Sequence, residues 1–145
     1  MDSPEENIKV LNEIHKGLVM GMESLSVIEP KVTDDSFRNL INSQYNEYTD
    51  ILINVNSELS KYNTSGDDTS TMQKVMGWST IQMNTLMDDS DSKISDMLIR
   101  GTTMGIIEGR KMLNNNDKID KKTKDILYNF VSKQEHDVEK LKEWL

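Results

Sequence analysis

The chain has 145 residues, of which 35% are hydrophobic and 29% charged, with a formal net charge of −8 and no cysteine. This length predicts a single domain over residues 1–145. The acidic balance argues against nucleic acid and anionic membranes as partners, because phosphate binding needs clustered Lys and Arg. Without cysteine, disulfides, thiolate nucleophiles and Cys-ligated metals are excluded.

A first helix is predicted over residues 3–29. Ser3 and Pro4 are typical of a helix start, with Glu6 placed to complete a capping box, and Pro30 ends the helix. Apolar residues recur every three or four positions, which indicates one buried face: Leu11, Ile14, Leu18, Met22 and Leu25. More apolar residues lie off this face and indicate a second contact surface: Val10, Val19, Met20 and Val27.

A second helix is predicted to begin at Thr33 and to fade near Asn63, with Asp34 and Asp35 in its first turn. Its 3-4 spacing is typical of bundle packing at a shallow crossing angle: Phe37, Ile41, Gln44, Tyr48, Ile51, Val55 and Tyr62. After a small polar loop, residues 71–87 predict a shorter helix with apolar residues on two sides, within the bundle or in a crossover.

Two more long helices are predicted in the last third of the chain. One is capped by Ser90 or Ser92 and runs to about residue 114. Its inward positions are Ile94, Leu98, Gly101, Gly105, Glu108 and Met112. The last helix covers about residues 117–145, and its apolar stripe is Ile119, Ile126, Leu127, Phe130, Gln134, Val138, Leu141 and Leu145. No strand-like alternation persists, so we predict an all-α fold: an antiparallel four-helix bundle with an additional shorter helix at 71–87.

Glycines are spaced four residues apart on two of these helices. Gly17 and Gly21 lie on the 3–29 helix, and Gly101, Gly105 and Gly109 on the 90–114 helix. A glycine inside a helix costs about 1 kcal/mol relative to alanine, but at this spacing it leaves a flat groove that another backbone can approach. We interpret the five as helix-packing glycines that bring these two helices together. The alternative is that they leave space for a ligand.

Four polar residues occupy positions of the apolar stripes and predict a buried polar layer: His15, Gln44, Gln82 and Glu108. Glu108 is the strongest candidate, because a buried carboxylate is costly unless it is paired or binds a metal. Three interpretations stay open. Glu108 reaches water at the boundary, the four residues hydrogen-bond to one another, or Glu108 and His15 hold a metal or small ligand with Gln44 or Glu29.

The motifs of familiar catalytic and metal sites are missing. A di-iron bundle needs two Glu-x-x-His pairs, whereas Asn12 and Lys133 stand three residues before His15 and His136. The acidic segment 88–91 lacks the glycine and the downstream glutamate of an EF-hand loop. No nucleophile elbow or phosphate-binding loop is present. We therefore predict no enzyme, no catalytic residue, no cofactor and no metal ligand.

Segments 14–22 (IHKGLVMGM), 76–86 (MGWSTIQMNTL) and 104–108 (MGIIE) resemble a family of small uncharacterised helical proteins from anaerobic Firmicutes. These look like members of the ferritin-like superfamily. The resemblance extends over most of the chain and implies an antiparallel bundle of ferritin-like type. It implies no activity, and the positions that would match ferritin-like metal ligands do not hold them.

The expected function is that of a non-enzymatic module for self-association or protein interaction. Its partner would be a second copy or another helical protein, through surplus apolar surface on the 3–29 and 71–87 helices. A divergent metal- or small-ligand-binding protein is one alternative, and a spore or stress structural protein is another. The polar, acidic N-terminus and the lack of a long apolar run predict a cytoplasmic protein without a membrane partner.

Overall fold

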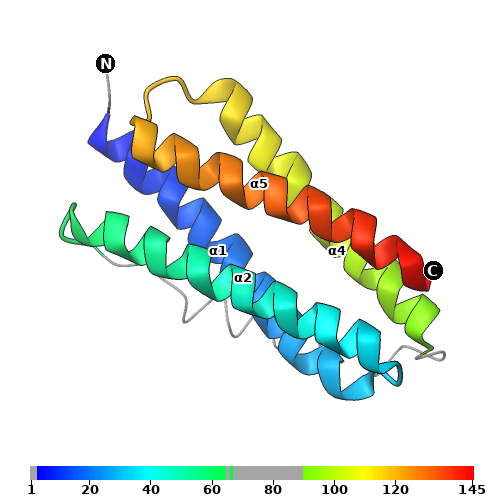
Figure 1. Ribbon diagram of the computed structural model, residues 1–145. Coiled ribbons are helices and arrows are strands. Elements are labelled where there is room, and N and C mark those ends of the chain that lie inside the picture. The colour runs from blue at the N-terminus through cyan, green and yellow to red at the C-terminus, as the bar shows by residue number, and fades with distance from the viewer. Residues whose placement is uncertain (1–2, 65, 67–89) are drawn as a thin grey trace.

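The computed structural model describes residues 3–64, 66 and 90–145. This part of the chain is all-α and contains no strand (Figure 1). Its elements are α1 (Pro4–Ile28), η1 (Glu29–Lys31), α2 (Asp35–Ser60), α4 (Asp91–Asn115), α5 (Lys121–Leu141) and η2 (Lys142–Trp144), where η marks a 3₁₀ turn. The helix predicted at 71–87, including Gln82, lies outside the described residues. None of the described helices combines the length and apolar character needed to cross a bilayer.

Side-chain caps fix the starts of α1 and α4 where the sequence predicted them. The Ser3 hydroxyl accepts a hydrogen bond from the Glu6 backbone N–H at 3.3 Å, and Pro4 is the first helical residue. Of the two candidate caps for α4, Ser90 is the one used, and its hydroxyl accepts the Lys93 N–H. These starts are local in sequence, so they need no tertiary contact.

The starts of α2 and α5 differ from the prediction. Asp34, rather than Thr33, caps α2 by accepting the Phe37 N–H at 2.8 Å. Asp120 caps α5 by accepting the Thr123 N–H at 2.8 Å, so α5 begins four residues after Asp117, the predicted start. In each case the aspartate that lies three residues before a free backbone N–H becomes the cap.

The four helices form two hairpins, α1 with α2 and α4 with α5, and the chain runs antiparallel within each hairpin (Figure 1). The end of α2 lies beside the start of α5, where the Tyr62 hydroxyl donates a hydrogen bond to Asp120 at 3.2 Å. The start of α4 lies beside the start of α2, where Asp91 accepts the backbone N–H of Thr33 at 3.1 Å. The chain therefore enters α4 at the opposite end of the bundle from the end of α2.

The predicted apolar stripes of α1, α2 and α5 supply most of the core. Its largest fully buried side chains are Phe37, Leu11, Ile14, Leu18, Ile41, Leu59, Ile94, Leu127 and Leu141. Burying one such side chain stabilises the fold by about 1.5–3 kcal/mol. Val10 and Val19, predicted to lie on a second surface of α1, are buried within the bundle, because α1 packs against α2, α4 and α5. Of the four residues predicted for that second surface (Val10, Val19, Met20 and Val27), only Met20 is exposed.

The predicted inward face of α4 is wrong in the middle of the helix. Ile94 and Leu98 are buried as expected, but Gly101 and Glu108 are exposed. Gly109 is buried in place of its neighbour Glu108. Successive helical residues point about 100° apart, so a rotation of α4 by some tens of degrees about its axis decides which of two neighbouring residues lies on the buried face.

Candidate functional site: a buried polar layer between α2 and α5

The α1 glycines make room for aromatic rings from the other helices. A Cβ built on Gly17 would lie 3.1 Å from the Phe130 ring of α5. One built on Gly21 would lie 2.8 Å from the Tyr48 ring of α2, closer than real Cβ contacts. The two rings meet edge to face with their centroids 6.3 Å apart. These glycines therefore admit side chains of α2 and α5.

Two of the α4 glycines make room for side chains of α5. A Cβ on Gly105 would overlap the amide nitrogen of Gln134, and one on Gly109 would overlap a methyl group of Val131. Gly101 has no such role, since no atom lies within 4 Å of the position its Cβ would take. The predicted packing of the two glycine faces against each other is thus corrected. Apart from Gly101, the glycines of each helix make room for side chains of other helices, which fill the space that a ligand would need.

Gly21 and Gly105 flank a layer of polar side chains, which we call the polar layer: Gln44, Glu47 and Tyr48 of α2 with Gln134 and Asp137 of α5. All of these except Glu47 are at most 5% exposed. The Gln134 amide interacts with the Tyr48 hydroxyl, and the carboxyl group of Asp137 interacts with that of Glu47.

Most of the unpartnered buried polar atoms found in the described residues belong to the polar layer. They are both carboxylate oxygens of Asp137, Oε2 of Glu47, Oε1 of Gln134 and Nε2 of Gln44. A carboxylate only accepts hydrogen bonds, so two ionised acids cannot bond to each other. Leaving a buried polar group without a partner costs about 1–3 kcal/mol, and more when it is charged. A bound proton or another polar ligand would give these unpartnered atoms a hydrogen-bond partner.

The same geometry shifts two ionisation equilibria. Burial, followed by the charge and hydrogen bonding of Glu47, raises the pKa of Asp137 to about 7, with Lys140 and Lys133 opposing the rise. Burial, followed by the charges of Asp137 and Glu47, raises the pKa of the Tyr48 hydroxyl above its usual range. Tyr48 is therefore a neutral phenol at physiological pH, whereas Asp137 exchanges its proton there.

The sequence missed both acids of the layer, although it placed Gln44 and Gln134 in buried stripes. A signal was present. Gln44-x-x-Glu47 on α2 and Gln134-x-x-Asp137 on α5 repeat one pattern, a glutamine followed three residues later by an acid. Residues three apart share a helix face, so each acid follows its buried glutamine inward.

Of the residues predicted for a buried polar layer, Gln44 lies in the observed one. His15 is buried and its Nδ1 has no hydrogen-bond partner, but it packs against Gly66. It also precedes Gly21 by six residues, or about 9 Å along α1. His15 therefore does not belong to the layer around Tyr48.

Glu108 corrects the prediction most clearly. Its side chain is 71% exposed and forms an ion pair with Lys111 at 3.6 Å. The structure does not bring Glu108 and His15 together, so the metal or ligand site suggested for them loses its basis. Over residues 3–64, 66 and 90–145, no three His, Cys, Asp or Glu side chains are grouped so that they could hold a metal ion.

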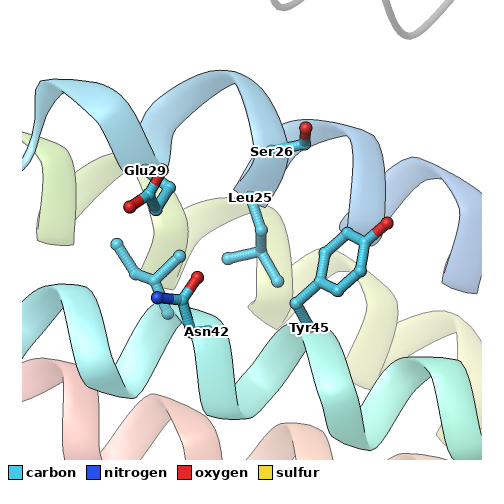
Figure 2. Close-up of a pocket in the computed structure, with 6 residues that line it drawn as sticks. Leu25, Ser26, Glu29, Asn42 and Tyr45 are labelled. Carbon is cyan, nitrogen blue, oxygen red and sulfur yellow. The ribbon is translucent and has the colours of Figure 1, made fainter.

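A surface depression of about 190 Å³ lies between α1 and α2 (Figure 2). Leu25 and Ile41 are apolar residues of its lining, and its polar residues include Asn42 and Tyr45. The carboxylate of Glu29 at its edge is already paired with Arg38 at 3.4 Å. Figure 2 shows that the polar groups do not converge on one point, so this depression has no evident ligand chemistry.

A second feature lies on the outside of α4. Met104 is 69% exposed and Ile107, three residues later, is 49% exposed. Gly101 lies one turn before Met104, and the exposed charged residues Glu108 and Lys111 border the other end. We call Gly101, Met104 and Ile107 the α4 surface. Other strongly exposed apolar side chains, such as Ile53 and Tyr128, are scattered on α2 and α5.

Comparison with known proteins finds no protein family, no curated protein and no solved structure that matches this chain.

Proposed function

We propose that this protein is a non-enzymatic, ferritin-like helical bundle that works by association, and that the α4 surface is where it associates. The observation that carries the proposal is the exposure of Met104 and Ile107 on one face of one helix. Single exposed apolar residues are normal, but neighbouring ones with charged residues at their border are typical of interaction sites.

The ferritin-like part of the proposal is supported by topology. Ferritin-like bundles join two antiparallel helical hairpins by one connection that crosses from end to end. Here α2 ends beside the start of α5, and α4 starts beside the start of α2. This agrees with the resemblance of residues 14–22, 76–86 and 104–108 to a family of small helical proteins that look ferritin-like.

The partner that fits best is a helical surface, in the simplest case a second copy of this chain. Full burial of a Met or Ile side chain contributes about 1.5–3 kcal/mol, and an isologous dimer would bury each of them twice. Gly101 has open space above it, so a partner helix can approach α4 closely there. The border charges Glu108 and Lys111 would give orientation more than affinity.

The test is sedimentation velocity on the full chain over a hundred-fold range of concentration. We expect reversible association that Met104→Glu and Ile107→Glu each weaken at least ten-fold. Ile53→Glu is the matched control, since Ile53 is 61% exposed on α2, and it should leave association unchanged. A wild-type chain that stays monomeric and retains no helical partner, or equal effects of all three variants, would rule the proposal out.

A further inference from the structure

The two acids of the polar layer come from opposite hairpins. Glu47 lies on α2 and Asp137 on α5, and each follows a buried glutamine by one helical turn. Asp137 is 1% exposed, and neither of its carboxylate oxygens has a hydrogen-bond donor. We propose that Asp137, beside the Glu47 carboxylate, is an internal proton-binding site, and that its bound proton couples the packing of α2 against α5 to pH.

A bound proton allows the two acids to hydrogen-bond to each other, which two ionised carboxylates cannot do. When one acid is protonated, its hydroxyl donates to the carboxylate of the other, and the pair carries one charge instead of two. A carboxyl group beside a second carboxylate retains its proton to higher pH than it would alone, and this applies to Asp137 beside Glu47. Burial acts in the same direction, because it penalises the charged form.

The groups around the pair offer little compensation for a second negative charge. The charges that act on Asp137 are Glu47 of α2 and, on α5 itself, Lys133 and Lys140. The Tyr48 hydroxyl of α2 lies in the same layer and stays neutral. The other two helices contribute glycines at this level, Gly21 of α1 against Tyr48 and Gly105 of α4 against Gln134. Lys140 and Lys133 are the basic groups that most strongly oppose the rise in the pKa of Asp137.

The sign of the pH dependence follows from proton binding. The pKa of Asp137 is about 7 in the fold and near 3.8 when the chain is unfolded. Between these values the folded chain holds more protons than the unfolded chain, so its stability falls as pH rises. For a pKa near 7, the folding equilibrium constant is expected to fall on the order of a hundred-fold from pH 5 to pH 8. Raising the pH thus loosens the contact between the hairpins.

This inference is independent of the proposed association, since the polar layer lies inside the bundle and the α4 surface outside. It is tested by urea unfolding of the full chain between pH 5 and pH 8, followed by circular dichroism. Wild type should lose stability as pH rises, and Asp137→Asn and Glu47→Gln should each remove most of this slope. Asp125→Asn is the matched control, because Asp125 is exposed on α5 and pairs with Lys121, and it should behave as wild type.

A direct readout keeps the test decisive if a variant does not fold. Carbon-13 NMR of the side-chain carboxyls in the wild-type chain should show one buried Asp that titrates near pH 7. Titration of every Asp below pH 5, or a wild-type pH slope in Asp137→Asn, would overturn the proposal. So would a large stabilisation of wild type, but not of Asp137→Asn, by Mg²⁺, Ca²⁺ or Mn²⁺ at pH 8, since the site would then take a cation.

Discussion

Gly101 and Gly109 stand on the same helix at equivalent spacing, yet the structure predicts opposite effects of replacing them by alanine. Gly101 is exposed, and nothing lies within 4 Å of an added Cβ. Gly101→Ala should therefore gain the helix propensity of alanine and stabilise the protein by about 1 kcal/mol.

Gly109→Ala gains the same propensity but inserts a methyl group against Val131, which is fully buried. A β-branched valine in a helix has one strongly preferred rotamer, so its methyl cannot turn away. Overpacking in a core costs about 1–3 kcal/mol, and an overlap with a fully buried methyl group belongs to the upper part of that range, about 2–3 kcal/mol. After the propensity gain of about 1 kcal/mol, a net destabilisation of roughly 1–2 kcal/mol remains. The two variants should thus differ by about 2–3 kcal/mol.

The measurement is urea unfolding at pH 6 followed by circular dichroism at 222 nm, with thermal unfolding as a second assay. A difference of 2–3 kcal/mol corresponds to a gap of about 6–12 °C in Tm for a chain of this size. A destabilised Gly101→Ala, or a Gly109→Ala as stable as wild type, would contradict the placement of α4 against α5.

Three further variants test other contacts. Asp91→Ala should lower the free energy of unfolding by about 1–2 kcal/mol in urea, because Asp91 accepts three hydrogen bonds from residues 33–34, each 3.1 Å long. Asp120→Ala should cost about 1 kcal/mol by removing the cap of α5. Although partial burial opposes it, hydrogen bonds from Thr123 and Tyr62 hold the pKa of Asp120 below its usual value. The contribution of Asp120 to the free energy of unfolding is therefore lost as pH falls below about 4. In urea unfolding from pH 3 to pH 6, Asp120→Ala should lose less stability on acidification than wild type does. Glu108→Gln should change the free energy of unfolding by less than about 0.5 kcal/mol in the same assay, because its side chain is exposed. A larger loss would indicate that Glu108 is buried after all.

The sequence by itself determined the elements with local signals. The start of α1 follows from Ser3 and Pro4, and the start of α4 was narrowed to Ser90 or Ser92, because a cap and its target lie within one helical turn. The buried faces of α1, α2 and α5 follow from apolar spacing, which is strong in each of them. The all-α class follows from these same patterns.

The tertiary structure decided how α4 is turned and what meets inside the bundle. The middle of α4 has small and apolar residues on several sides, so spacing alone did not distinguish Glu108 from Gly109 as the buried position. Only packing against Val131 and Gln134 fixes that rotation. The pairing of Glu47 with Asp137 joins residues 90 positions apart in the chain, and a local pattern carries no information about such a contact. A helix's periodicity tells which residues share a face, whereas the partner that covers this face depends on the whole fold.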